Sequence, residues 1–299
     1  MPYIFGWRQT FFGILLGLAD NSIMSTPENT SQTLAFIGGG NMASAIIGGL
    51  IKQGMTPQQL LVVEPFEEAR ARLRAQFGIR TLSAADAQLA DASLVIWAVK
   101  PQVFKEAAHQ AGTFCNNALH FSVAAGIRSD SIAHWLGTER VIRAMPNTPA
   151  LVGLGQTGLY ARPAVTTADK AQVEHVVATT GHLLWVDDES LLDAVTAISG
   201  SGPAYVFFFI EAMVEAGVKM GLSAEQATQL AVGTFEGASQ LAKTAHEPPS
   251  VLRERVTSKG GTTYAALTSM QHAHVSELFQ TALHAAQQRA RELGDEFGA

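Results

Sequence analysis

Through the first two thirds of the chain, short apolar runs alternate with longer stretches whose apolar residues recur every three or four positions. The short runs predict buried strands, and the longer period predicts helices. The predicted strands are Leu34–Ile37, Leu60–Val63, Leu94–Ala98, His120–Val123, Arg140–Ala144, Thr157–Tyr160 and Leu183–Val186. The predicted helices between them include Met42–Gln53, Glu67–Gln76 and Pro101–Ala111. This alternation predicts an α/β domain with a doubly wound, mainly parallel sheet that helices cover on both faces.

The last third of the chain shows helical periods alone. The predicted helices are Leu191–Ile198, Ala204–Met220, Ala224–Lys243, Thr262–Met270 and Val275–Glu296, with a further short helix from Pro248-Pro249. The run Phe207–Ile210 belongs to a helix that is apolar almost all round, and such a helix is buried in a core or in a subunit interface. We expect the interface, because a domain of ~110 residues has little room to enclose it.

A glycine-rich turn follows the first predicted strand directly and opens the first predicted helix. Its pattern, Gly38-x-Gly40-x-x-Ala43, is a dinucleotide-binding fingerprint of Rossmann-type domains. Gly38 permits the tight turn, Gly40 lets the backbone approach a pyrophosphate, and Ala43 lets helix and strand pack closely. The N–H groups at the helix start, including those of Asn41 and Met42, favour a phosphate. Taken alone, the pattern also fits an ordinary strand–helix turn.

Glu64 ends the second predicted strand, 24 residues beyond Gly40. An acidic residue in this position usually accepts hydrogen bonds from the adenosine ribose and favours NAD over NADP. The alternative is a carboxylate that caps the helix after Pro65. Arg70 and Arg72 lie on that helix and do not follow Glu64 immediately, so the sequence leaves the choice between NADPH and NADH open.

The carboxyl ends of later strands carry small residues and prolines. In a doubly wound sheet these ends line the ligand crevice. We therefore expect the cofactor site to include Ala98, Val99, Lys100, Pro101, Ala124 and Asn147. Asn147 stands between two prolines, where its side chain either bonds a ligand or stabilises its own turn.

A second candidate anion site lies in the helical region, at Ser258-Lys259-Gly260-Gly261-Thr262-Thr263. Successive N–H groups of a Gly-Gly turn entering a helix, together with hydroxyls, make a cradle for one carboxylate. We name Ser258, Gly261, Thr262 and Thr263 as the substrate-binding and catalytic candidates. A plain threonine-capped helix is the alternative on local grounds.

The composition fits two globular domains and argues against some classes of binding partner. The chain has 299 residues, of which 47% are hydrophobic and 15% charged. We expect an N-terminal extension over 1–33, a dinucleotide-binding domain over 34–186 and a helical domain over 187–299. The net charge of −6, without a lysine and arginine cluster, argues against a nucleic-acid partner. Cys115 is the single cysteine, so an intrachain disulfide and a cysteine-rich metal site are excluded, and we expect no metal.

The first residues carry a weak targeting signal. Phe11–Ala19 is an apolar run behind Arg8 that faintly resembles a signal peptide, but it is too short to span a bilayer. Met24 opens a polar stretch that leads into the first strand. We hypothesise that Met24 is the physiological start and that residues 1–23 are upstream sequence. We expect a cytoplasmic protein with no membrane partner.

Six separated blocks together resemble the pyrroline-5-carboxylate reductase family. The resemblance covers the chain from Leu34 to about the last helix. The blocks that carry it are Phe36–Ala43, Val99–Gln102, Met145–Pro149, Ser199–Tyr205, Val218–Leu222 and Gly260–Thr263. It implies reduction of L-1-pyrroline-5-carboxylate to L-proline with NADPH or NADH, the last step of proline synthesis.

The resemblance also implies an arrangement of the site and of the subunits. The turn from Gly38 to Ala43 holds the pyrophosphate, Ala98 to Pro101 border the nicotinamide, and Gly261, Thr262 and Thr263, with Ser258 nearby, hold the substrate carboxylate. The helical domain of the family forms an interlocked homodimer, and the dimers often assemble into decamers. Glu64 departs from the small polar or basic residue of many relatives. Either His246 or Glu247 takes the place of an acidic residue near the substrate nitrogen.

Two other functions suit parts of the same pattern. A dehydrogenase of the β-hydroxyacid type relies on a lysine in the helical domain, for which Lys219 and Lys243 are candidates, although neither lies beside a glycine-rich loop. A non-catalytic nucleotide-sensing oligomer needs no carboxylate cradle, whereas this chain has one.

Overall fold

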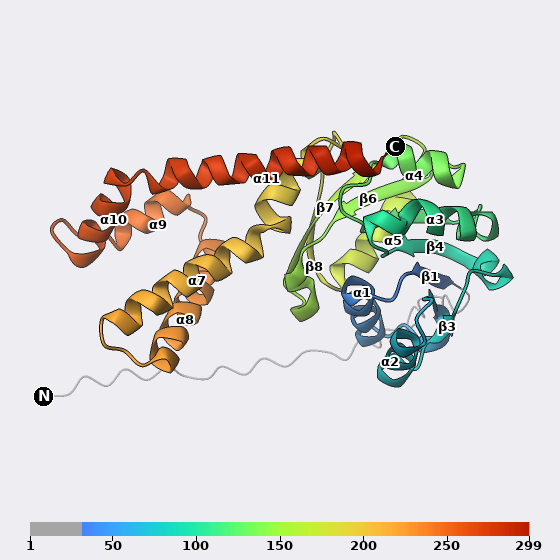
Figure 1. The fold of residues 1–299 in the computed structure, drawn as a ribbon, viewed down its shortest axis with the longest axis horizontal. Helices are drawn as coiled ribbons and strands as arrows, with labels where there is room; N and C mark the ends of the chain where they lie inside the picture. The colour runs from blue at the N-terminus through green and yellow to red at the C-terminus, as the bar shows by residue number, and fades with distance from the viewer. Residues whose placement is uncertain (1–31, 299) are drawn as a thin grey trace, which may run out of the picture. The chain divides into compact units, whose positions relative to one another are not determined.

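The computed structural model describes residues 32–298. The run Phe11–Ala19 and the hypothesised start at Met24 lie outside them. The described residues form one compact unit that contains a single mixed sheet and a series of helices (Figure 1).

Eight strands make up the sheet in the described part of the chain, in the spatial order β3-β2-β1-β4-β5-β6-β7-β8. Their bounds are β1 Thr33–Ile37, β2 Leu60–Val63, β3 Arg80–Leu82, β4 Ala92–Trp97, β5 Leu119–Ser122, β6 Val141–Met145, β7 Gly155–Ala161 and β8 Gly181–Trp185. Neighbouring strands are parallel except for β6 and β7. Strand order reverses at β1, whose neighbours are β2 and β4, and a doubly wound sheet binds its ligand at such a switch point.

Eleven α-helices lie within residues 32–298. Their bounds are α1 Asn41–Lys52, α2 Glu67–Phe77, α3 Pro101–Ala111, α4 Ser129–Leu136, α5 Thr167–Ala178, α6 Leu191–Val195, α7 Gly202–Lys219, α8 Ala224–Thr244, α9 Pro249–Arg255, α10 Thr262–His272 and α11 Val275–Phe297. Short 3-10 turns are η1 Pro57–Gln59, η2 Ala87–Asp91, η3 Gly112–Phe114 and η4 Thr148–Val152. A π-helical turn, η5 Thr196–Gly200, joins α6 to the loop before α7.

Both faces of the sheet are buried, which confirms the predicted fold class. Successive residues of β1 enter opposite cores: Leu34 and Phe36 belong to one buried cluster, Ala35 and Ile37 to the other. Side chains of a strand alternate between faces, so two cores require apolar residues at every position. Helices α1 and α5 contribute to the first cluster, and α3 and α4 contribute to the second.

The differences from the predicted elements are local. Strand β3 was not among the predicted strands, because it is a three-residue edge strand that begins with the exposed Arg80 and has no apolar run. The helix predicted over Leu191–Ile198 is an α-helix only to Val195 and continues as the π-helical turn.

The helical region exposes most of its apolar surface. Figure 1 shows α7 and α8 side by side, with α9 and α10 near the start of α11 and the end of α11 near the sheet. Phe207 and Phe208 in α7 are 59% and 65% exposed, and Gly217 is the one buried residue of this helix. The segment Leu191–Lys219 is long and apolar enough to span a membrane by length and composition alone, with 6% of its most apolar window buried. Helix α7 is therefore apolar on all sides without being packed in the core of its own chain.

Polar contacts connect the sheet to the helical region at its first residues. Arg143 of β6, which is 4% exposed, donates to Glu189 Oε1 at 3.0 Å. The same carboxylate accepts from the N–H and the hydroxyl of Ser129 at the start of α4. At the far end of α11, Arg128 pairs with Asp295 at 2.6 Å. The segment before α6 is thus anchored by an ion pair between the buried Arg143 and the half-buried Glu189.

A buried histidine makes stability sensitive to acid. His120 of β5 is 1% exposed, and its Nδ1 accepts from Trp97 Nε1 at 3.1 Å. Burial, followed by the nearby positive charge of Arg140, lowers its pKa from 6.5 to about 4. The folded-state pKa lies below the unfolded one, so stability present above pH 6.5 is lost as the pH falls towards 4.

We expect this histidine to account for up to about 3 kcal/mol of unfolding free energy between those pH values. Urea unfolding at several pH values should show the loss in the wild type and a shallower dependence in His120→Gln, which does not titrate. Parallel curves for the two proteins would contradict the assignment.

Candidate active site

The turn after β1 is built so tightly that position 38 accepts glycine alone. Gly38 has φ +96°, in the left-handed region, and its N–H donates to Val63 O at 2.9 Å. A Cβ at this position would lie 2.7 Å from Ala98 O. Ala98 in turn donates its N–H to Ile37 O at 2.8 Å. The ends of β1, β2 and β4 are therefore joined through one turn at the switch point.

The start of α1 fits a pyrophosphate. Gly40 is the N-cap, and no side chain caps the helix. A Cβ on Gly40 would meet no atom within 4 Å, so this glycine faces open space and a ligand can approach its backbone. The first N–H groups of a helix, here those of Asn41, Met42 and Ala43, have no intrahelical acceptor. The buried Ala43 packs against the sheet, as the fingerprint requires.

The end of β4 forms the opposite wall of the crevice. Ala98 and Val99 contact the position where a Gly38 side chain would stand. Lys100 is the exposed N-cap of α3, and Pro101 is its first residue. Backbone and small apolar groups thus lie at this end of β4, and their contact with a cofactor stays a prediction.

Two other predicted cofactor residues lie at neighbouring strand ends. Ala124, beyond β5, is 4% exposed and donates its N–H to Ser122 Oγ at 3.3 Å. Asn147, beyond β6, accepts from Gln156 N at 2.8 Å and donates to Ser199 O at 3.0 Å. The Asn147 side chain therefore ties the end of β6 to η5, rather than stabilising its own turn, and its role toward a cofactor stays a prediction.

Glu64 lies against the glycine-rich turn. Its Oε2 accepts from Gly39 N at 2.9 Å, and its Oε1 accepts from Phe66 N at 3.1 Å. It is 8% exposed. Glu64 thus holds the N–H of Phe66, the N-cap residue of α2, and that of the nucleotide-binding turn, but no side chain caps the first N–H groups inside α2. Sequence reasoning missed the part of Gly39, whose Cβ would meet Leu73 at 2.6 Å.

The predicted glycine turn is present at the start of α10, and its binding of a carboxylate stays a prediction. Gly260 has φ +73°, and Gly261 is an N-cap without a side-chain cap. Gly261 donates its N–H to Ser258 O at 3.0 Å, and a Cβ on Gly261 would lie 2.6 Å from Ser258 Oγ. The turn therefore holds Ser258 beside the first N–H groups of α10, those of Thr262 and Thr263.

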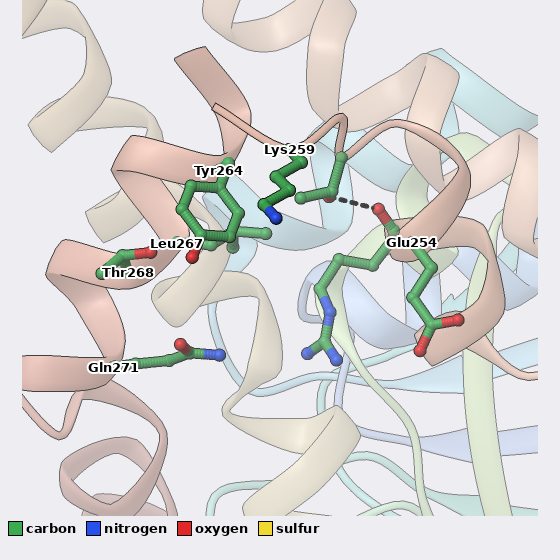
Figure 2. A pocket seen from close by; sticks show the side chains of 8 residues that line it. Glu254, Lys259, Tyr264, Leu267, Thr268 and Gln271 are labelled. Atoms are coloured by element: carbon green, nitrogen blue, oxygen red, sulfur yellow. Dashed lines mark hydrogen bonds between the residues drawn. The ribbon is translucent and has the colours of Figure 1, made fainter. Parts of the chain in front are cut away.

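A pocket of about 440 Å³ adjoins the cradle between α9 and α10. Figure 2 shows Lys259 and Tyr264 on its lining, with Thr268 and Gln271 further along α10. The remaining lining residues are Arg253, Glu254, Thr257 and Leu267. The pocket thus places cationic and hydroxyl groups next to the predicted carboxylate site.

One chain does not bring the cradle to the nucleotide crevice. Figure 1 shows α10 at the start of α11, whereas the sheet lies near the other end of that helix. A helix of the length of α11, 23 residues, spans about 34 Å. The two predicted halves of the site are therefore separate within a single subunit.

The remaining candidates have other partners. Glu247 pairs with Arg255 at 2.6 Å, while His246 is exposed, so both stay predictions for the substrate nitrogen. Lys243 Nζ lies 3.3 Å from His182 Nε2, and Lys219 ends α7; neither belongs to the cradle. Within residues 32–298, no group of histidine, cysteine, aspartate and glutamate side chains is arranged to hold a metal.

The sheet, its switch-point crevice and the uncapped α1 define a Rossmann-type dinucleotide-binding protein with an all-helical C-terminal region. Residues 33–126 match the family model described as NADP oxidoreductase coenzyme F420-dependent, and residues 189–293 match that of pyrroline-5-carboxylate reductase dimerisation. The pyrroline-5-carboxylate reductase of Pseudomonas aeruginosa is 44% identical over 92% of this chain and 100% of its own length. That of Haemophilus influenzae is 39% identical over 88% of this chain and 97% of its own. The chain therefore belongs to the pyrroline-5-carboxylate reductase family.

Solved structures agree with this membership. A pyrroline-5-carboxylate reductase from Coxiella burnetii has a TM-score of 0.82 and 36% identity, over 88% of this chain and 98% of that one. The pyrroline carboxylate reductase of Plasmodium falciparum, solved with NADP bound, has a TM-score of 0.78 and 28% identity over the same shares. The predicted family, and the fold that it implied, are confirmed.

Proposed function

We propose that this chain reduces L-1-pyrroline-5-carboxylate to L-proline by hydride transfer from NADPH or NADH, the last step of proline biosynthesis. The observation that carries the proposal is that one chain contains two helices, α1 and α10, whose starts have no side-chain cap. One lies at the switch point of a dinucleotide-binding sheet, and the other lies in a glycine turn of the dimerisation region. They suit a cofactor pyrophosphate and a substrate carboxylate respectively.

For this reaction the protein needs to orient the substrate and the cofactor more than it needs to transfer a proton. The bound nicotinamide supplies the hydride, and a protonated C=N bond is already electrophilic. The N–H groups of Thr262 and Thr263, which lack an intrahelical acceptor, fix the carboxylate and so orient the ring. The apolar wall at Ala98 and Val99 excludes water from the nicotinamide side. Positioning of this kind supplies much of the rate acceleration, so an acid–base dyad is not required.

We propose that a second copy of the chain completes the site. The match to a dimerisation model and the exposed apolar face of α7 support a homo-oligomer. A homodimer that buries α7 would bring the cradle of one subunit to the crevice of its partner, which explains why one chain keeps them apart. Decamers, and a cytoplasmic location without membrane or nucleic-acid partners, remain part of this proposal. Burial of α7 between subunits accounts for its apolarity without a bilayer.

One spectrophotometric assay tests the proposed function. Purified chain is mixed with pyrroline-5-carboxylate and either NADH or NADPH, and oxidation of the nucleotide is followed. We expect oxidation that depends on the imine. Oxidation or reduction with β-hydroxyacids alone would favour the other dehydrogenase class, and binding of nucleotide without turnover would favour a sensor.

The cradle predicts a specific effect on KM. In Thr263→Ala the loss of a hydrogen bond to a carboxylate should raise KM for pyrroline-5-carboxylate about ten- to a hundredfold, while the protein stays folded. Ser269→Ala is the matched control, since Ser269 is exposed further along the same helix. Steady-state kinetics and thermal melting measure both variants. Unchanged kinetics in Thr263→Ala would remove this residue from the site.

A further inference from the structure

The loop between β5 and α4, residues 123–128, lies at the crevice and is bonded to its wall. Val123 donates its N–H to Trp97 O, at the end of β4, at 3.0 Å. Ala124, the cofactor residue predicted for this loop, follows directly and is buried. Strand β5 pairs with β4, whose end adjoins Gly38. A shift of the loop would therefore be transmitted to the end of β4, where the nicotinamide is expected.

The last turn of α11 lies directly against this loop. Gly126 is buried with φ +71°, and a Cβ on it would lie 3.1 Å from Leu293 Cβ and 3.4 Å from Phe297 Cδ2. From the helix side, a Cβ on Gly294 would lie 3.0 Å from Arg128 Nε. Loop and helix thus meet at the level of the backbone, and a glycine on each side permits this close approach.

Two polar contacts fix the direction of the helix end. Arg128 Nη2 donates to Asp295 Oδ1 at 2.6 Å, and Ser131 Oγ, in the first turn of α4, donates to Gly298 O at 2.9 Å. Figure 1 shows the end of α11 near α4. The Arg128 and Asp295 side chains are 44% and 69% exposed, so their pairing contributes little to stability.

Phe297 makes the apolar part of the contact. It packs against the second buried cluster, which contains Ala124 and Ile127 from the loop and Ile132 from α4. Burial of an aromatic side chain contributes more than an exposed ion pair does. Phe297 is therefore the main residue through which α11 holds the loop.

The other end of α11 adjoins the predicted substrate site. Helix α10, which starts at the Gly260-Gly261 turn, packs on α11, and α11 is continuous over Val275–Phe297. One helix thus connects the substrate turn of a chain to the cofactor wall of the same chain. The match to the dimerisation model ends at residue 293, so a change at Phe297 leaves the matched segment intact.

We propose that Phe297 is a positioning residue for hydride transfer, because it holds the loop 123–128 and thereby the nicotinamide end of the crevice. The inference rests on the proposed function and assigns a part in it to a residue outside both glycine turns. Phe297 acts through the loop and not by contact with the cofactor. Hydride transfer requires two carbons to be aligned, so a looser wall lowers kcat more than it weakens binding of the nucleotide.

Phe297→Ala in the full-length protein tests the proposal with two measurements. Hydrogen exchange of the amides of residues 123–128, with and without NADPH, should be faster than in the wild type, because their packing is lost. Exchange at the start of α1 should not change. With pyrroline-5-carboxylate as substrate, kcat should fall about tenfold, while KM for the nucleotide changes by less than about threefold. Phe297→Leu, which keeps an apolar side chain, should recover most of kcat.

Phe77→Ala is the matched control. Phe77 is likewise the last residue of its helix, α2, and is half-buried, but it packs against the first buried cluster. This variant should lower the melting temperature about as much as Phe297→Ala does and leave kcat and loop exchange unchanged. Gly126→Ala places a methyl group against Leu293 at φ +71° and should reproduce the fall in kcat from the loop side.

Three results would overturn the positioning role. They are unchanged loop exchange in Phe297→Ala, faster loop exchange with an unchanged kcat, and an equal fall of kcat in Phe77→Ala. A wild-type protein without turnover of pyrroline-5-carboxylate would overturn the proposed function, whereas the exchange measurement would still decide whether Phe297 holds the loop.

Discussion

Replacement of Gly38 by alanine is expected to destabilise the protein and to abolish measurable cofactor binding. The new Cβ would lie 2.7 Å from Ala98 O, in a backbone conformation with φ +96°. The left-handed conformation alone costs an L-residue about 1–2 kcal/mol. The backbone overlap adds to this, and it can be relieved only if β1 and β4 move apart at the switch point. Thermal melting and titration with NADH should both show the loss.

Gly40→Ala separates the two effects. A Cβ at position 40 meets no atom within 4 Å, and φ there is −75°, which alanine adopts freely. We expect a wild-type melting temperature but weakened binding of both NADH and NADPH, because the methyl group occupies the space through which a pyrophosphate approaches. Wild-type affinity in Gly40→Ala would show that the pyrophosphate does not lie against this turn. Wild-type stability in Gly38→Ala would contradict the account of the tight turn.

Removal of Arg143 is expected to produce the second large effect, on stability. Arg143→Ala leaves the Glu189 carboxylate with the N–H and hydroxyl of Ser129 but without its buried cation. Breaking a fully buried ion pair from one side costs about 3–5 kcal/mol, and because the Glu189 side chain is 21% exposed we expect a loss near the lower end of that range. Urea unfolding should therefore show a clearly lower unfolding free energy, and the segment before α6 should become more susceptible to proteolysis.

Two further variants distinguish the buried pair from ordinary surface charges. Arg289→Ala removes an arginine that pairs with Glu292 and Glu296 on the exposed face of α11, and such pairs contribute little. The double variant Arg143→Met with Glu189→Leu removes both buried charges and should recover part of the loss. A loss in Arg143→Ala no larger than that in Arg289→Ala would contradict the argument.

The seven predicted strands were accessible from the sequence because their signal is local. Each long strand needs apolar residues on both faces, and this requirement is visible as a run such as Leu60–Val63. Strand β3 was not visible in this way, since it is held by pairing with β2 rather than by burial of its own side chains. The antiparallel pairing of β6 with β7 likewise depends on how the chain returns to the sheet.

The candidate site likewise contains features that were predictable from local sequence and features that were not. Gly38, Gly40 and the Gly260-Gly261 turn were predicted from the sequence because a tight turn into a helix requires these residue types wherever it occurs. The contacts of Glu64 with Gly39 and Phe66, and of Asn147 with Ser199, were not predictable, since each side chain had two chemically reasonable partners. The separation of the cradle from the crevice was also hidden, because it depends on the direction of α11.

What the sequence by itself determined is the set of parts: a mainly parallel sheet with two apolar faces, a dinucleotide turn, a second glycine turn that enters a helix, and an apolar helix that is not packed in its own core. These follow from periodicity and from the conformational needs of glycine, which act over a few residues. Only the tertiary structure decided which parts contact one another. In it, Glu64 bonds the glycine turn, and Arg143 and Glu189 connect β6 to the helical region. The Gly260-Gly261 turn lies away from the dinucleotide turn of the same chain. Those outcomes depend on packing between residues far apart in sequence, for which a linear pattern carries no physical signal.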